Sequence, residues 1–302
     1  MNKTLTFSPV TAGFLFAIAS AALFAIRPIF VKLVYAQGID PTTLIAFRML
    51  FSLPVYIFLL CFFLRDPNKR ARLSATNIAC ASGAGLLGYY VSSFLDLLGL
   101  QYVTAQLGRM ILYVYPTFVV LLGAAFFGKK ITLTTIIALS ITYLGVAVLF
   151  GHDINQFGDD VMLGSAYILA CAFTFSLYLL FSKPLITEIG SLIFTCISLI
   201  SASIGILIHY SITHSIASPA VNTTSLLLIL FIAIFCTVIP TFFTTAAVAR
   251  IGPDRTGILA MVGPAFTSFF AVFIINETFT IYHCIGIILS VIGVASLNRK
   301  KN

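Results

Sequence analysis

A succession of long apolar runs constrains this chain more than any other feature. A helix needs about 20 mostly apolar residues to cross a bilayer, whereas the strands of membrane barrels alternate over about ten. Only 9% of the residues are charged, against roughly a quarter in soluble domains. The sequence therefore predicts an all-α polytopic membrane protein with ten transmembrane helices. The predicted spans are 12–34, 42–64, 76–100, 104–127, 131–150, 162–182, 191–211, 225–248, 256–276 and 279–297.

The positive charges fall mainly on one side of this predicted topology. Of the 17 Lys and Arg residues, 13 lie in the breaks and tails of one side, while Lys32 lies at the opposite face. Arg27, Arg48 and Arg109 lie within spans. Because cytoplasmic loops are enriched in Lys and Arg, both termini are predicted to be cytoplasmic. The net charge of +8 thus follows from membrane orientation, and we predict no nucleic-acid partner.

Two parts of the chain repeat each other at an offset of 148 residues. Pro116 corresponds to Pro264, and Gly145 to Gly293. Five spans in each half is an odd number, so the second half starts from the opposite side of the membrane, which gives the inverted repeat common in carriers. The predicted domains are a first five-helix repeat at 1–151, a periplasmic linker at 152–160 and a second five-helix repeat at 161–302.

The end of each repeat carries a family pattern. A proline in the fourth helix is followed by a Gly-Glu-x-x-Thr turn and by a fifth helix that ends in Gly-Val-x-x-Leu. The chain thereby resembles the EamA family of the drug/metabolite transporter superfamily, which implies a multi-pass protein of the bacterial inner membrane. Lys129 departs from the pattern, in which Glu is frequent. The matching residues are Pro116, Gly128-Lys129-Lys130-Ile131-Thr132 and Gly145-Val146-Ala147-Val148-Leu149, then Pro264, Asn276-Glu277-Thr278-Phe279-Thr280 and Gly293-Val294-Ala295-Ser296-Leu297.

Four ionisable residues lie inside predicted spans: Arg27, Arg48, Asp96 and Arg109. Such residues are costly in a membrane and usually mark function. Asp96 and Arg109 are equidistant from the vertex of a predicted helical hairpin, so they form either a structural ion pair or a shared site for substrate or protons. Arg27 and Arg48 either face the same cavity or extend to the outer headgroups.

Polar side chains form a stripe in the third predicted helix and again in its repeat mate. The polar residues Tyr89, Ser92, Ser93 and Asp96 lie on one helical face because of their i, i+3, i+4 and i+7 spacing. Such a stripe either lines a central cavity or packs against a neighbouring helix. A proline that breaks a helix leaves backbone groups without helical partners, and a cavity can use these groups. We predict that Tyr89, Ser93, Asp96, Arg109, Tyr113, Tyr178, Thr241 and Thr244 bind substrate and that Pro116 and Pro264 break their helices.

These features favour a secondary transporter that moves a small metabolite by alternating access without ATP. The excess of arginine predicts a substrate that carries a carboxylate or a phosphate, such as an amino acid or another carboxylate-bearing compound, because guanidinium groups bind both anions in a bidentate manner. The expected partners are this substrate, the lipid bilayer and protons, which could couple through Asp96. The six cysteines are scattered, so neither a metal nor a cofactor is predicted. The alternatives are a lipid or lipid-carrier flippase of the same fold and, least favoured because no catalytic motif is present, an intramembrane enzyme.

Overall fold

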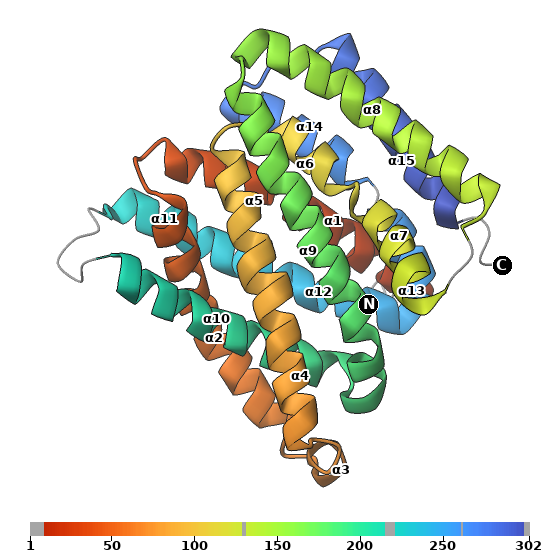
Figure 1. The fold of residues 1–302 in the computed structure, drawn as a ribbon. Helices are drawn as coiled ribbons and strands as arrows, with labels where there is room; N and C mark the ends of the chain where they lie inside the picture. The colour runs from red at the N-terminus through yellow and green to blue at the C-terminus, as the bar shows by residue number, and fades with distance from the viewer. Residues whose placement is uncertain (1–8, 129–130, 215–220, 261, 299–302) are drawn as a thin grey trace, which may run out of the picture.

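The computed structural model describes residues 9–128, 131–214, 221–260 and 262–298, and all regular structure in these ranges is helical (Figure 1). Helices suit a membrane because they satisfy their own backbone hydrogen bonds. Eight helices are long and apolar enough to cross a bilayer, and two shorter apolar helices are Gly263–Ile275 and Ile281–Gly293. The chain is therefore a polytopic membrane protein. The ninth predicted span is divided between two helices and the tenth forms one shorter apolar helix, which leaves the number ten a prediction.

The first half of the chain forms nine helical elements. They are α1 (Pro9–Tyr35), α2 (Pro41–Phe63), α3 (Pro67–Arg70), α4 (Ala75–Gly85), the π-helical turn η1 (Leu86–Val91), α5 (Ser92–Leu100), α6 (Ala105–Leu112), α7 (Tyr115–Phe127) and α8 (Leu133–Phe157). The second half consists of α9 (Asp160–Ile189), α10 (Ser191–Thr213), α11 (Thr223–Ala233), the π-helical turn η2 (Ile234–Val238), α12 (Ile239–Ile251), α13 (Pro253–Ala260), α14 (Gly263–Ile275) and α15 (Ile281–Asn298).

The sequence offset of 148 residues recurs in the local structure. The two π-helical turns begin at Leu86 and Ile234, which are equivalent positions. The helices α7 and α14 both end at a left-handed residue, Gly128 with φ 62° and Asn276 with φ 54°. Glycine and asparagine are the residues that adopt this conformation most readily. Equivalent positions thus adopt the same unusual backbone geometry.

Both predicted proline breaks coincide with interruptions of a helix. The first separates α6 from α7 near Val114, and the second separates α13 from α14 near Val262. Pro116 and Pro264 lie in the first turn of the helix that follows each break. A proline is tolerated there because the first-turn N–H has no acceptor within the helix.

The two halves pack closely against each other. Helices α8 and α15 run side by side along one edge of the molecule (Figure 1). A Cβ atom on Gly293 would lie 2.2 Å from Thr142 Oγ1, and one on Gly145 would lie 2.6 Å from the Gly286 carbonyl oxygen. Elsewhere α1 packs against α12 and α14, while α9 packs against α5 and α7. Every helix that contributes to the site below is therefore held by the opposite half.

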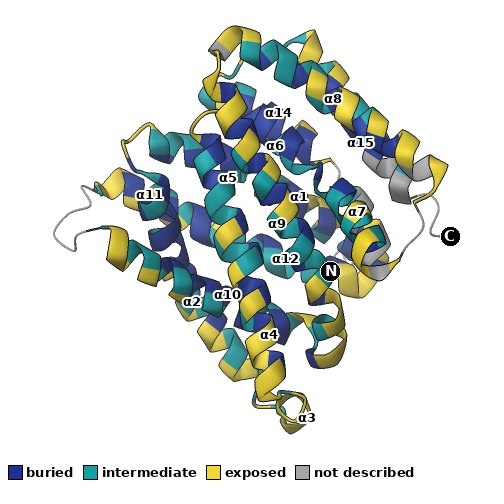
Figure 2. Cartoon of the chain, in the orientation of Figure 1, coloured by how far each residue is buried: buried dark blue, intermediate teal, exposed yellow. Residues whose placement is uncertain are grey.

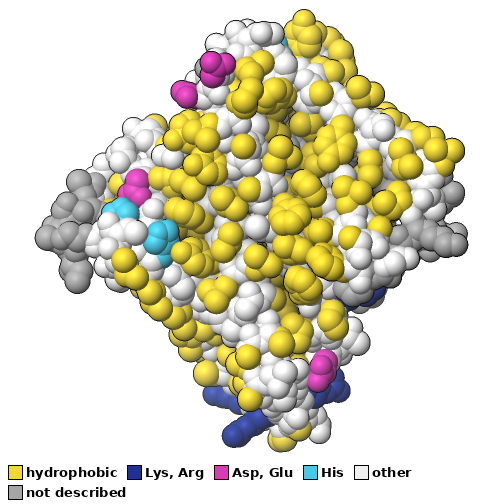
Figure 3. Space-filling model, in the orientation of Figure 1, with side chains coloured by type: hydrophobic (Ala, Val, Ile, Leu, Met, Phe, Trp, Pro, Cys, Tyr) yellow, Lys and Arg dark blue, Asp and Glu magenta, His cyan; other side chains and the backbone are white. Residues whose placement is uncertain are grey.

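The bundle has two ends that differ in charge. We name the end with the turns at 36–40, 101–104 and 276–280 the Asp40 end, and the opposite end with α3 the Arg65 end (Figure 1). On the face shown in Figure 3, Lys and Arg gather at α3, and an apolar belt covers the molecule between the ends. Large exposed apolar side chains include Phe58 and Phe273, at 68% and 71% exposure. Figure 2 shows exposed residues on the outward faces of these helices, as expected for contact with lipid.

Candidate functional site

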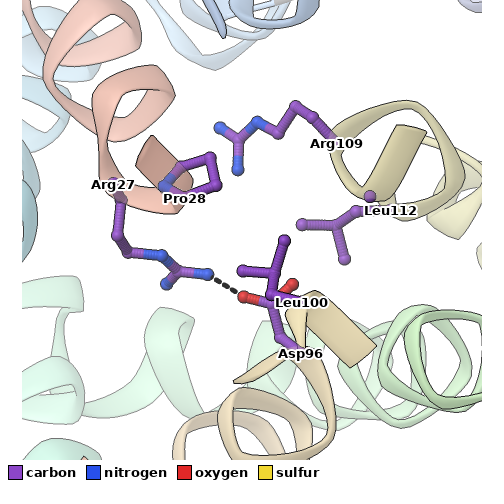
Figure 4. Close-up of a pocket in the computed structure, with 7 residues that line it drawn as sticks. Arg27, Pro28, Asp96, Leu100, Arg109 and Leu112 are labelled. Atoms are coloured by element: carbon purple, nitrogen blue, oxygen red, sulfur yellow. Dashed lines mark hydrogen bonds and ion pairs between the residues drawn. The ribbon is translucent and has the colours of Figure 1, made fainter. Parts of the chain in front are cut away.

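A small charged cavity lies where α1, α5 and α6 meet (Figure 4). Asp96 of α5 is 4% exposed, and its carboxylate accepts a hydrogen bond from Nη2 of Arg27 in α1. A buried ion pair of this kind requires close packing of the elements that carry it. The residues that line the cavity are Arg27, Pro28, Asp96, Leu100, Gly108, Arg109 and Leu112.

Gly108 allows α6 to approach its neighbours at this point. A Cβ atom there would lie 3.0 Å from Leu100 Cδ2 and 3.1 Å from Ile168 Cδ1, which is tighter than ordinary van der Waals contact. Arg109, the next residue, extends from α6 into the same space as Arg27 (Figure 4). The absence of a side chain at position 108 thus helps to place Arg109 beside the Arg27–Asp96 pair.

The predicted hairpin ion pair between Asp96 and Arg109 is wrong. Both side chains line the cavity, but the carboxylate bonds to Arg27, because α1 packs against both α5 and α6 and brings a competing guanidinium to it. Arg109 instead lies over Tyr113, with its guanidinium carbon 5.6 Å from the ring centre. Within the described residues, no acidic group lies within ion-pair distance of Arg109.

A buried polar stripe on α2 escaped the sequence analysis. Arg48, Ser52 and Tyr56 are each at most 1% exposed, and the Ser52 hydroxyl donates to the Arg48 carbonyl oxygen at 2.8 Å. Arg48 therefore does not extend to the headgroups, and that alternative is wrong. Its guanidinium is close enough to Arg27 and Asp96 to interact electrostatically. The i, i+4, i+8 spacing was a usable signal for this stripe.

The residues of the predicted stripe on the third span contact two different neighbouring helices, α9 and α1. Tyr89 accepts a hydrogen bond from the hydroxyl of Tyr178 in α9 at 3.2 Å, and Ser92 donates to the Cys171 carbonyl of α9 at 3.3 Å. Asp96 instead bonds to α1, and Ser93 is half-buried on α5. Ser92 and Asp96 lie one turn apart on α5, so the division arises because α9 and α1 pack against successive turns of the same helix.

The two predicted threonines of α12 do not line the charged cavity. The Thr241 hydroxyl donates to the carbonyl of Thr237 in its own helix at 2.7 Å. The Thr244 hydroxyl lies 2.6 Å from that of Ser20 in α1, and Ser20 also donates to the Pro240 carbonyl at 2.8 Å. The contacts of Ser20 with Thr244 and Pro240 join α12 to α1, which is the packing role left open for such residues.

Tyr113 connects the two helix breaks. It lies at the end of α6, and its hydroxyl donates to the carbonyl of Ala260 at the end of α13. A Cβ atom on Gly263, at the start of α14, would lie 2.2 Å from the same hydroxyl oxygen. The interrupted helices of the two halves therefore meet at their breaks, next to Arg109.

The carboxylate of Glu277 joins the two halves at the Asp40 end. It lies between α14 and α15 and accepts hydrogen bonds from the first two N–H groups of α6, from Ala105 at 2.7 Å and from Gln106 at 3.3 Å. The Gln106 side chain donates to the Thr278 carbonyl at 3.2 Å. Burial raises the pKa of Glu277, although these hydrogen bonds and Lys32 oppose the shift. We call this contact the Glu277 cap.

Packing among the helices differs at the two ends of the bundle, both between the halves and within each half. Toward the Asp40 end, α6 packs against α14 and α15, and α5 packs against α1 and α2. The equivalent pairs at the Arg65 end are α13 with α7 and α8, and α12 with α9 and α10. Among the described residues, these pairs make at most marginal contact. The charged cavity is therefore covered more completely from the Asp40 end.

The chain is similar to known transporters along its length. The family model described as "EamA-like transporter family" matches residues 11–151 and again 162–299. An uncharacterized transporter of Bacillus subtilis, YcbK, is 26% identical over 91% of this chain and 89% of its own length. An uncharacterized transporter of Clostridium kluyveri is 23% identical over 96% and 95%, respectively. A crystal structure with 15% identity covers 95% of this chain and 96% of its own, with a TM-score of 0.67, which shows the shared fold.

Proposed function

The chain belongs to the EamA-like transporter family, and from that premise we propose that it is a secondary carrier of a small metabolite. It moves this substrate without ATP by alternating access. The substrates that we propose are amino acids and other carboxylate-bearing compounds, with protons as the candidate coupling ion. The relatives in Bacillus subtilis and Clostridium kluyveri are named as transporters too.

The proposed architecture is ten spans in two inverted five-helix repeats, 1–151 and 161–302, joined by residues 152–160. In this arrangement α13 and α14 together form the ninth span, and α15 forms the tenth. The equivalent positions of η1 and η2 support the repeat. The cluster of Lys and Arg at α3 supports a cytoplasmic Arg65 end (Figure 3) by the positive-inside rule. Both termini then lie in the cytoplasm and the Asp40 end faces outward from a bacterial inner membrane.

The difference in packing between the two ends carries the proposal. Inverted repeats allow one set of contacts to close the outer side and its equivalent set to close the inner side. The structure has the first set and, among the described residues, at most marginal contacts in the second. We interpret it as the state closed to the outside. The opposite state follows when α7 meets α13 and the Glu277 cap separates.

Arg109 is the residue that we assign to the substrate carboxylate. Its guanidinium lies in the cavity beside the Arg27–Asp96 pair, and Tyr113 positions it beside the helix breaks. A guanidinium presents two parallel donors to a carboxylate. Asp96 is the candidate proton carrier. The remaining predicted residues, Tyr89, Ser93, Tyr178, Thr241 and Thr244, stay candidates for contacts in the opposite state.

An uptake screen in proteoliposomes tests the proposal. Purified wild-type protein and the variant Arg109→Ala would be compared with amino acids, organic acids, phosphorylated metabolites and cationic dyes. We expect saturable uptake of a carboxylate-bearing compound by the wild type and a loss of at least about tenfold in the variant, as for one lost charge-assisted contact. Arg70→Ala, which removes an exposed arginine of α3, is the matched control. Uptake of a cationic dye that is unchanged in Arg109→Ala would contradict the proposal.

A further inference from the structure

The centre of the bundle holds more buried arginines than acids. Arg27, Arg48 and Arg109 lie around one carboxylate, that of Asp96. Arg27 has the carboxylate as its ion-pair partner. Arg48 is 1% exposed, and its Nε and Nη1 atoms find no hydrogen-bond acceptor among the described residues, nor does Nε of Arg109. Buried charges without partners are costly. Each negative charge at this place therefore strongly lowers the free energy of the state in which these arginines are buried.

The carboxylate of Asp96 lies in the cavity in which the substrate's carboxylate would bind. It points from α5 toward Arg27, and Arg109 extends toward the same space from α6 (Figure 4). A substrate carboxylate that enters the cavity would therefore meet the same guanidinium groups. Arg27 then has two alternative anionic partners, one that belongs to the protein and one that belongs to the substrate.

We propose that Asp96 supplies, in the empty carrier, the negative charge that the substrate's carboxylate supplies in the loaded carrier. This inference rests on the proposed function. A carrier can change state only when its buried charges remain compensated, because their exposure to lipid or to a closed interior is costly. With Asp96 present, the empty carrier can return and net transport results. Without Asp96, only the loaded carrier changes state, and the protein becomes an exchanger.

The proposal can be tested without knowledge of the substrate. In a variant without native cysteines, Leu112→Cys places a thiol in the cavity. An impermeant maleimide added to intact cells then labels the thiol only when the Asp40 end opens. For the empty protein we expect Asp96→Ala to lower the labelling rate by about tenfold or more. The isosteric Asp96→Asn, which preserves the shape of the side chain, should give the same loss if Asp96→Ala does not fold.

Chemical rescue separates a charge effect from damage to the structure. Asp96→Ala leaves room for a small molecule, so added acetate should restore the labelling rate. Acetamide, which has a similar shape and no charge, should not. The matched control is Ser92→Ala, one turn earlier on α5, because Ser92 is buried and bonds to α9 rather than to the cavity. It should label at the wild-type rate.

Three results would overturn the inference: wild-type labelling in folded Asp96→Ala, a loss that acetate does not restore in folded protein, or equal rescue by acetamide. Each variant is first checked by its elution as a monodisperse peak in detergent. Failure of the proposed function looks different. In that case the uptake screen finds no transported carboxylate in the wild type, whatever Asp96→Ala and acetate do to the labelling rate. A wild-type protein that is never labelled from outside would contradict the proposed topology instead.

Discussion

The two ends of this molecule are built from repeated sequence, yet they are stabilised differently. At the Asp40 end, α6 begins at Ala105, and its first N–H groups bond to Glu277. The equivalent helix α13 begins 148 residues later at Pro253, which has no N–H to donate. The position equivalent to Glu277 is Lys129, which lies outside the described residues and carries no acceptor. Two substitutions between the repeats thus remove the acceptor and the first of the two N–H donors of this contact from the Arg65 end.

Other helix starts show that the difference is local. Ser74 accepts from the Asn77 N–H at the start of α4, and Asn222, at the equivalent position, accepts from the Ser225 N–H at the start of α11. These two caps match. In contrast, α2 is capped by Asp40, whereas α10 follows Gly190 and has no side-chain cap. Repeated sequence therefore does not impose equal contacts at the two ends, and under the proposed alternating access such contacts would set the balance between the two closed states.

Removal of the Glu277 cap should have the largest effect on this balance. In Glu277→Ala, two N–H groups at the start of α6 lose their acceptor, at a cost of about 1–3 kcal/mol. We expect the Asp40 end to open more often and the labelling of Leu112→Cys from that end to rise by about tenfold. Asp159→Ala removes an exposed acid at the same end and should change nothing. A rate equal to wild type in folded Glu277→Ala would show that the cap does not hold this end closed.

The opposite change should transfer the contact to the other end. The double variant Lys129→Glu with Pro253→Ala restores the acceptor and the donor at the positions that the repeat makes equivalent. One new cap is worth about 1 kcal/mol, which corresponds to roughly a fivefold shift. We expect labelling of Leu112→Cys from the Arg65 end of inverted membrane vesicles to fall by that factor. Pro253→Ala alone supplies a donor without the acceptor, and Lys129→Glu alone lacks the first of the two donors. A double variant no different from either would contradict the equivalence.

The cap on α2 should contribute a smaller amount to stability. Burial alone would raise the pKa of Asp40, but hydrogen bonds from Thr43 and Thr42 and the nearby His214 outweigh burial and hold the pKa below its ordinary value. The stabilisation is thus present above the ordinary pKa of about 3.9 and is lost as the pH falls through the lowered pKa. We expect Asp40→Ala to cost about 0.5–1 kcal/mol at neutral pH, measured by thermal unfolding in detergent. Asp40→Asn, which can still cap, should lose less, and equal losses would show that capping is not the cause.

Local features of the fold could be predicted from sequence because they depend on nearby residues. Apolar runs specified the helices, and Pro116 and Pro264 specified the breaks, since a proline limits its own helix whatever surrounds it. The cost of buried charge also singled out Asp96 and Arg109, and both line the cavity. The description of the chain as a polytopic membrane protein needed no information about contacts between helices.

Contacts between distant helices could not be predicted in the same way. The partner of Asp96 depends on where α1 packs, and nothing near position 96 in the sequence indicates Arg27. The π-helical turn η1 has no sequence signature that we recognised, and the division of the polar stripe between α9 and α1 depends on where those helices pack. The Glu277 motif was visible as a family pattern, but its acceptor role depends on the approach of α6 from the other half. Sequence repeats predict equivalent backbones better than equivalent side-chain contacts.

The dependence of the Glu277 cap on pH should be the smallest effect and the most specific. Burial raises the pKa of Glu277 in the closed Asp40 end, whereas in the open end the exposed carboxyl group should titrate near its ordinary value of about 4.3. The closed form therefore binds a proton more tightly, so it gains stability as the pH falls through the raised pKa and gains no more below the ordinary value. We expect labelling of Leu112→Cys from the Asp40 end to slow by a few-fold on acidification from neutral pH, after correction for the intrinsic reactivity of a free thiol. Glu277→Gln should abolish this dependence, because a glutamine does not titrate. If acidification instead accelerates labelling in the wild type, the ionised carboxylate must be the form that holds the end closed.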